Sequence, residues 1–265
     1  NHRIWVVAGG KLQRFDLGRK EFNTIALPAK VTSICGGHDG SLWLALMGEQ
    51  GFVFAGKLDP LTDACITFPR SRESMVPPKD LNSLSVYEDT QGVVWIGTFN
   101  GGLYRFDKQA HTYRRFRSSD ADSGTIMTDA VSSIVEDPTG NLWIGTHVGL
   151  HRFDRKSERF EYISHPVYSS TTLSRFFIRG LVHDARGNLW LASGPALSRF
   201  HILQRGFRDF GGDEGLDIGR LGVIHFDREK RTIYVGGMNG LAVFHPDSLV
   251  QNPHIPSVVL TSFKV

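Results

Sequence analysis

Cysteine is scarce in this chain of 265 residues, which contains only Cys35 and Cys65. The repeat described below places them on the first and fourth strands of one small sheet. Three interstrand steps of roughly 4.8 Å separate such strands by about 14 Å, and a disulfide cannot span that distance. We therefore expect two free thiols, which say nothing about the redox compartment.

Long apolar runs and one-sided charge are missing as well. No segment approaches the ~18 apolar residues that a membrane-spanning helix needs, and no signal-peptide pattern is present. The 30 basic and 27 acidic residues give a formal charge of +3, and the basic residues recur along the chain instead of forming a stripe. This distribution argues against a nucleic-acid-binding protein.

The usual patterns of catalytic and metal sites are absent too. None of the eleven histidines pairs with another ligand at the spacing of a metal site. No Ser-His-Asp arrangement and no carboxylate pair can be argued from spacing. We expect no catalytic residue, no metal and no cofactor.

What the chain does contain is one pattern, repeated six times. An aromatic residue recurs every 38 to 52 residues and accounts for all five tryptophans: Trp5, Trp43, Trp95, Trp143, Trp190 and Tyr234. A glycine lies three residues before four of them: Gly40, Gly92, Gly140 and Gly187. A period of 40–50 residues with one aromatic anchor predicts a β-propeller.

Residues 131–163 show the repeating unit most clearly. Apolar and β-branched runs predict strands at 131–136, 142–146, 150–154 and 159–163, and Asp137–Gly140 predicts a tight turn closed by a glycine bulge. The fold class is therefore all-β: a propeller of four-stranded antiparallel blades, with six repeats in residues 1–250. The first repeat lacks its first strand, and a seven-bladed ring with a further blade upstream of Asn1 remains an alternative.

Two features flank or interrupt the repeats. Residues 251–265 predict a linker and the first strand of a following β-sandwich module, and the chain begins in mid-repeat without Met, so we expect a piece of a longer protein.

Gly211–Gly215 reads Gly-Gly-Asp-Glu-Gly, which is similar to the diguanylate cyclase signature. It lies between two repeats without any α/β pattern, so we interpret it as a turn between blades.

The recurring side chains favour structural roles. One tryptophan at a fixed strand position in each repeat indicates packing between blades more than a series of sugar-stacking platforms. A second series, Arg14, Arg105, Arg152 and Arg199, stands beside a phenylalanine on the third strand. We expect these arginines to be solvated or to lie between blades.

The motif G-N-L-W-I-G-T-x-x-G-L-x-R-F-D, complete in the fourth repeat, resembles the two-component regulator propeller family. The resemblance covers residues 1 to about 250, and Asp213–Leu216 matches the link that this family uses between blades. It implies a non-enzymatic periplasmic sensor region of an inner-membrane protein, followed by a β-sandwich, a transmembrane helix and a kinase or cyclase output. It also implies a small-molecule or oligosaccharide ligand, a homodimer formed through the full-length protein, and membrane attachment only through flanking segments.

Two other functions remain open. Streptogramin lyases are similar propellers with a catalytic histidine and a metal-binding carboxylate, for which His147 with Glu49 or Asp129 would be the candidates here. A protein-binding scaffold is the third hypothesis. For a ligand site we select the loops after the second strands and the links between blades, where the repeats differ: Glu49, Arg72, Phe99, Asn100, Asp129, His147, Arg175, Asp213, Met238 and Asn239.

Overall fold

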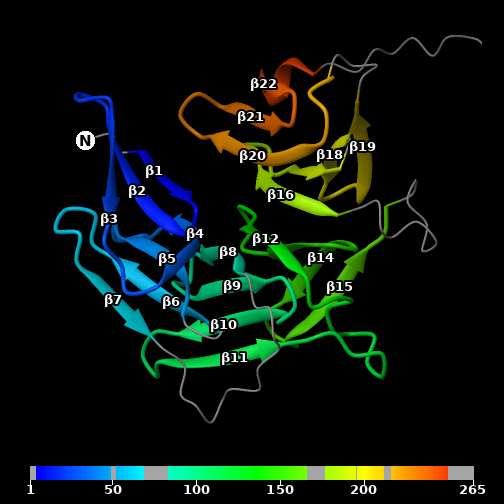
Figure 1. The fold of residues 1–265 in the computed structure, drawn as a ribbon. Coiled ribbons are helices and arrows are strands. Elements are labelled where there is room, and N and C mark those ends of the chain that lie inside the picture. Colours follow the sequence, from blue (N-terminus) through cyan, green and yellow to red (C-terminus); the bar gives the residue numbers. More distant parts are fainter. Residues whose placement is uncertain are drawn as a thin grey trace, which may run out of the picture.

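The computed structural model describes residues 4–48, 52–68, 83–165, 177–194, 196–211 and 216–249. Within these ranges the strands form six antiparallel sheets, and each strand pairs with the next one along the chain. The sheets follow one another as the blades of a propeller (Figure 1). The predicted fold class, a six-bladed all-β propeller, is confirmed. The predicted linker and module at 251–265 lie outside the described residues.

The blades are numbered here in chain order. Blade 1 contains β1 (Ile4–Ala8), β2 (Lys11–Asp16) and β3 (Glu21–Ile25), and blade 2 contains β4 (Lys30–Gly36), β5 (Leu42–Met47), β6 (Val53–Leu58) and β7 (Cys65–Phe68). Blade 3 contains β8 (Ser83–Glu88), β9 (Val94–Thr98), β10 (Leu103–Asp107) and β11 (Thr112–Phe116).

Blade 4 contains β12 (Val131–Glu136), β13 (Leu142–Thr146), β14 (Gly149–Asp154) and β15 (Arg159–Ile163), and blade 5 contains β16 (Ile178–His183), β17 (Leu189–Ser193), β18 (Ala196–His201) and β19 (Gly206–Phe210). Blade 6 contains β20 (Leu221–Asp227), β21 (Thr232–Gly237) and β22 (Gly240–Phe244), after which Pro246–Ser248 form a single 3-10 turn, η5. No helix in the described part of the chain is long and apolar enough to cross a membrane.

Glycines close the turns between first and second strands as the sequence predicts. Gly92, Gly140 and Gly187 have φ values of 77°, 87° and 78°, a region that side chains with a Cβ rarely occupy. Each donates its backbone N–H to the carbonyl of the aspartate three residues earlier, as Gly140 does to Asp137 at 2.9 Å. The turn sequence thus fixes the first hairpin of blades 3, 4 and 5.

The tryptophans fill the spaces between blades. Trp43, Trp95, Trp143 and Trp190 are at most 2% exposed, and the Trp143 ring contacts Phe200 of the next blade with centroids 5.6 Å apart. The predicted packing role is therefore confirmed. Because every core lies between two sheets, each blade depends on its neighbours for its stability.

The arginine series also lies between blades in two places. Arg14 pairs with Asp63 of blade 2, and Arg105 pairs with Glu158 of blade 4, each at 2.7 Å.

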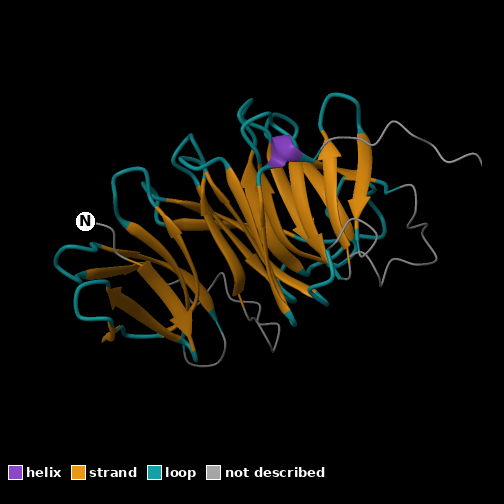
Figure 2. Cartoon of the chain, turned by 90° about the horizontal axis from the view of Figure 1, so that it is seen from above, coloured by secondary structure: helices purple, strands orange, loops and turns teal. Residues whose placement is uncertain are grey.

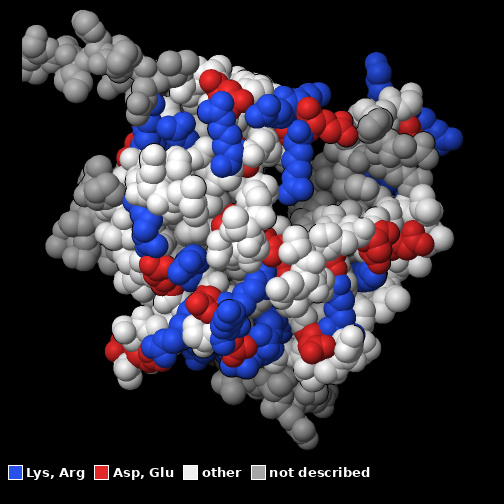
Figure 3. Space-filling view, turned by 180° about the vertical axis from the view of Figure 1, so that it is seen from behind, with Lys and Arg blue, Asp and Glu red and all other residues white. Residues whose placement is uncertain are grey.

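Basic and acidic side chains are interleaved over the face that Figure 3 shows, in keeping with the spread of charge in the sequence. Cys35 and Cys65 are free thiols, as predicted.

Candidate functional site

The propeller has two faces, and each carries one group of loops. We call turn face the one formed by the turns between first and second strands, such as Asp137–Gly140, and loop face the opposite one, formed by the loops after the second strands, which carries His147. Consecutive first strands, β4, β8, β12, β16 and β20, pack against one another around the middle, and Figure 2 shows the blades side by side. Residues at the ends of the first strands therefore meet on the propeller axis.

On the loop face, two of the predicted site residues come together. The rings of Phe99 and His147 lie 5.1 Å apart, and His147 also packs on Phe177, with centroids 3.7 Å apart. The Arg179 guanidinium lies 4.5 Å from the Phe177 ring. Burial, and then the charge of Arg179, lower the pKa of His147, so its imidazole is neutral at pH 7.

The other predicted residues are scattered. Asp129 accepts hydrogen bonds from Arg117 and Ser118 at 2.8 Å, so its carboxylate is directed at its own link and does not form a pair with His147. Asn100 and Asn239 are exposed, and Met238 is 78% exposed. Glu49, Arg72, Arg175 and Asp213 lie outside the described residues. Among the described residues, Phe99 and His147 are the predicted pair whose rings lie close together, and a ligand role for the whole set stays a prediction.

On the turn face, an aspartate anchors the tryptophan of its own blade. The indole N–H groups of Trp95, Trp143 and Trp190 donate to Asp89, Asp137 and Asp184 at 2.8, 2.7 and 2.9 Å. The same carboxylates accept backbone N–H groups of the turn. Sequence reasoning assigned these aspartates to the turn only, although three copies place an aspartate six residues before a tryptophan.

Polar contacts between blades 3 and 4 extend this arrangement. Glu136, at the end of β12, accepts the backbone N–H and the hydroxyl of Thr90 at 2.6 and 2.8 Å. Arg155 bridges Asp89 of blade 3 and Glu136 of blade 4 at 2.6 and 2.9 Å. Both carboxylates are almost fully buried, so the guanidinium neutralises two charges that would otherwise be costly to bury.

A pocket of about 380 Å³ opens beside this network on the turn face. Four blades contribute to its lining: blade 3 with Tyr87, blade 4 with Glu136 and Pro138, blade 5 with His183, and blade 6 with Phe226 and Arg228. Its size falls within the range of small-molecule sites. It combines aromatic surface with a few convergent polar groups, the composition that such sites share.

The polar groups of the pocket have defined roles. Arg228 can only donate, so its contact with His183 Nε2 at 3.2 Å makes that nitrogen the acceptor. His183 Nδ1 then donates to the Asp184 carbonyl at 3.1 Å. Burial raises the pKa of Tyr87, and the nearby Glu136 carboxylate acts in the same direction. The pocket therefore presents a neutral phenol and a guanidinium that the His183 imidazole orients.

This pocket escaped the sequence reasoning, which placed the site on the loop face. A signal was present near the end of the first strands, at the residue that pairs with the one just before the aromatic anchor. The repeats differ in chemistry at this position: Gly36, Glu88, Glu136, His183 and Phe226. Among the described residues no group of three or more histidine, cysteine, aspartate or glutamate side chains could hold a metal ion.

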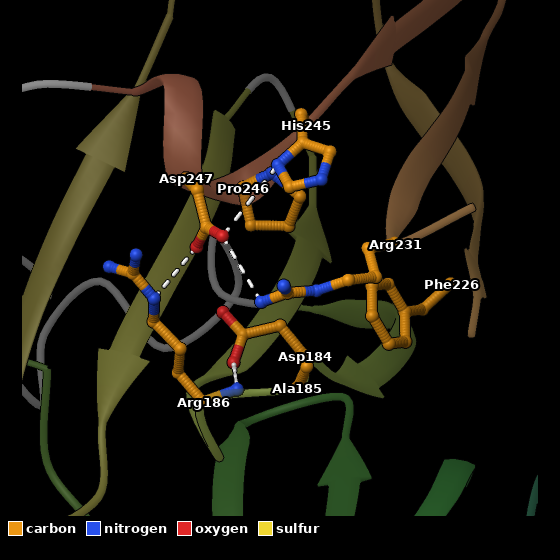
Figure 4. A pocket seen from close by; sticks show the side chains of 8 residues that line it. All are labelled: Asp184, Ala185, Arg186, Phe226, Arg231, His245, Pro246 and Asp247. Atoms are coloured by element: carbon orange, nitrogen blue, oxygen red, sulfur yellow. Dashed lines mark hydrogen bonds and ion pairs between the residues drawn. The ribbon is translucent and has the colours of Figure 1, made fainter. Parts of the chain in front are cut away.

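A second, much smaller pocket lies nearby and has a structural role. Its volume is about 10 Å³, room for about one water molecule. Figure 4 shows Asp247 of η5 between Arg186 of blade 5 and Arg231 of blade 6, with contacts of 2.7 and 3.1 Å. These ion pairs hold the segment after blade 6 against the turn of blade 5.

Comparison with known proteins agrees with this architecture. The family model for the two component regulator propeller matches residues 78–100 and 125–147. None of the curated proteins matches the chain.

Solved structures of low sequence identity share the fold. The extracellular domain of a protein described as a hybrid two component system, from B. thetaiotaomicron, is 21% identical, with a TM-score of 0.62 over 82% of this chain and 28% of that one. A second such domain from B. thetaiotaomicron, described as a one component system, is 16% identical, with a TM-score of 0.70 over 91% of this chain and 31% of that one.

Virginiamycin B lyase from Staphylococcus aureus is 13% identical, with a TM-score of 0.66 over 91% of this chain and 75% of that one. The chain thus spans about 30% of the two extracellular domains, and at these identities the likenesses describe the fold alone. The family model matches two segments of the chain, which include β9 of blade 3 and β13 of blade 4. These two segments are similar to repeats of the two-component regulator propeller family.

Proposed function

We propose that this chain is a ligand-sensing, non-enzymatic propeller from the extracytoplasmic part of a transmembrane signalling protein. The observation that carries the proposal is the turn-face pocket, because side chains from four blades converge on it. A ligand that contacts Tyr87, His183 and Arg228 joins blades 3, 5 and 6. Its binding free energy therefore favours one arrangement of the blades over others, which is what a sensor requires.

The chemistry of the pocket suits a small polar molecule such as a saccharide. Arg228, which His183 orients, and Tyr87 offer hydrogen bonds to a ligand, and the Tyr87 and Phe226 rings provide apolar surface. A periplasmic location, and passage of the signal to a cytoplasmic kinase or cyclase, complete the proposal. The repeat family and its extracellular structural neighbours support both.

The test is binding of a panel of neutral and acidic oligosaccharides to the purified chain, followed by thermal shift and then by calorimetry. Ligand binding stabilises the folded form by mass action, so a saturating sugar raises the midpoint of unfolding. Arg228→Gln and Tyr87→Phe should weaken the binding about tenfold each, as the loss of one hydrogen bond to the ligand does. Arg205→Gln is the matched control, since Arg205 pairs with Glu161 on the outside of the propeller.

The same binding experiment can instead place the ligand site on the loop face. If Phe99→Ala and His147→Gln abolish binding while Arg228→Gln leaves it unchanged, the ligand site is the aromatic corner of the loop face. Turnover of a bound compound by the purified chain would contradict the non-enzymatic part of the proposal.

A further inference from the structure

On the turn face, the chain twice places a carboxylate of one blade against the turn of the blade before it. Glu88, at the end of β8, accepts the backbone N–H of His38 from the turn of blade 2 at 2.8 Å, and it pairs with Lys108 of its own blade. Glu136 has the same repeat position in blade 4. It accepts the corresponding N–H of blade 3 at 2.6 Å and pairs with an arginine of its own blade at 2.9 Å. Each unit thus joins a carboxylate, a backbone N–H and a cation.

Between blades 4 and 5, all three parts of this unit are replaced together. Blade 5 has His183 at the position of the carboxylate and Ile202 at that of the cation. The turn of blade 4 has Pro138 at the position that donates the N–H, and proline has no N–H to donate. The concerted change leaves no donor without its acceptor and indicates that the three parts act as one unit.

Between blades 5 and 6, the carboxylate is lost but the donor remains. Blade 6 has Phe226 at the position of the carboxylate and Pro246 at that of the cation. Ala185, at the donor position in the turn of blade 5, keeps its N–H, and no residue in the described part of the chain accepts it. A donor is therefore directed at a place where two other interfaces have a carboxylate oxygen.

The turn of blade 5 has the hydrogen bonds of the turn of blade 3, so the Ala185 N–H has the direction that the Thr90 N–H has. In both turns, the aspartate carboxylate accepts the backbone N–H groups two and four residues later. The distances are 3.1 and 2.8 Å for Asp89, and 2.9 Å for both bonds of Asp184. The glycines that close the two turns have φ values of 77° and 78°.

Arg228 provides a positive charge beside this donor. It lines the turn-face pocket together with Ala185 and Phe226, and it donates to His183 Nε2 at 3.2 Å. It forms no ion pair with any acidic side chain that the structure describes, whereas the arginines of the small neighbouring pocket both pair with Asp247. A guanidinium matches the geometry of a carboxylate, so Arg228 can replace the missing cation of the unit.

The acidic side chains that line the pocket already have donors of their own. Glu136 pairs with Arg155. Asp184 accepts N–H groups of its turn and an indole N–H, and Asp137 has the same contacts in blade 4. Because buried carboxylates are stable only with such partners, these groups stay with their donors. Arg228 is left as the charged group that a ligand can reach.

We propose that the ligand supplies the missing carboxylate: it is a sugar acid, such as a hexuronate, whose carboxylate accepts the Ala185 N–H and pairs with Arg228. This inference rests on the proposed function, since it names the class of saccharide that the turn-face pocket takes. In the units of Glu88 and Glu136, one carboxylate oxygen accepts the backbone N–H and the other pairs with the cation. The ligand carboxylate binds in the same way, and the aromatic rings of the pocket contact the sugar ring.

The experiment compares sugar acids with neutral sugars that lack only the carboxylate. D-Glucuronate and D-galacturonate are titrated alongside D-glucose and D-galactose, and acetate serves as a carboxylate without a sugar ring. The chain is produced with isotope-labelled alanine and arginine, so that the Ala185 N–H and the Arg228 guanidinium report binding by NMR. Ala185→Pro and Arg228→Gln assign the two signals by removing them, and the affinity of each variant is read from the signal that remains.

At least one sugar acid should shift both signals and bind at least about tenfold more tightly than its neutral counterpart, as a charge-assisted hydrogen bond provides. Arg228→Gln should remove this advantage. Ala185→Pro should weaken binding about threefold to tenfold, and the turn of blade 4 already has Pro138 at this position. Arg220→Gln is the matched control. Arg220 is exposed beside the loop face, and its loss changes the net charge equally but should leave the affinity unchanged.

Three results overturn the inference. If a neutral sugar binds as tightly as its acid, or if Arg228→Gln leaves the affinity for the acid unchanged, the pocket does not recognise a carboxylate, and the sensor proposal stands with a neutral ligand. If acetate binds as tightly as the sugar acids, the site is a general anion site. If neither sugar acid shifts either signal up to its solubility limit, recognition of an acid fails. The oligosaccharide panel then decides the sensor proposal by itself.

Discussion

The indole N–H of Trp43 lacks the aspartate contact that those of Trp95, Trp143 and Trp190 make, and this difference can be measured. Trp143 donates to the buried Asp137 carboxylate at 2.7 Å, whereas Trp43 Nε1 is buried without a hydrogen-bond partner. Phenylalanine at either position removes similar volume, but only Trp143→Phe takes a donor from a buried charge. We expect it to lower the free energy of unfolding by about 1–2 kcal/mol more than Trp43→Phe does. Equal losses in urea denaturation would contradict the anchoring role of Asp137.

A second prediction at this scale concerns pH. His151 is 0% exposed, and burial lowers its pKa to about 4, against about 6.5 in the unfolded chain. Between these two values the unfolded state binds a proton that the folded state excludes, so stability falls as the pH is lowered from 6.5 to 4. The full loss is about 3 kcal/mol. Unfolding experiments on His151→Leu should show a flatter dependence over this window, and an unchanged slope would contradict the burial argument.

Among the elements, the ion-pair network between blades 3 and 4 is expected to matter most. Arg155→Met leaves the buried Asp89 and Glu136 carboxylates without their shared cation, which should cost about 3 kcal/mol. Arg205→Met removes an exposed pair with Glu161 and should cost less than about 1 kcal/mol. Similar losses in the two variants, measured by denaturant unfolding, would show that the network contributes no more than a surface ion pair.

The strands themselves could be predicted because their signals are local. A turn of aspartate and glycine, a tryptophan three residues later and an alternating strand determine each hairpin, so β12, β13 and β15 have the predicted bounds. β14 begins at Gly149, one residue before the predicted start, because Gly149 still pairs with Thr146.

The turn-face pocket could not be predicted in the same way. Tyr87 and Arg228 are far apart in the sequence and meet only because the blades close around an axis. Their spacing depends on the number of blades and the lengths of the links, neither of which follows from periodicity. What the sequence does offer is the change of residue type at the ends of the first strands, and that signal has meaning only once the fold is known.

At the scale of the whole molecule, the same substitution should cost much more stability in the middle of the array of blades than at its end. Leu197 and Leu241 occupy equivalent positions, and they are 1% and 62% exposed. Leu197→Ala opens a cavity between blades 5 and 6 and should cost about 2–5 kcal/mol, whereas Leu241→Ala should cost less than about 0.5 kcal/mol in this chain. Denaturant unfolding of both variants measures the difference. A large loss for Leu241→Ala would mean that its face is already covered, because removing methyl groups from solvent-exposed positions does not create a cavity.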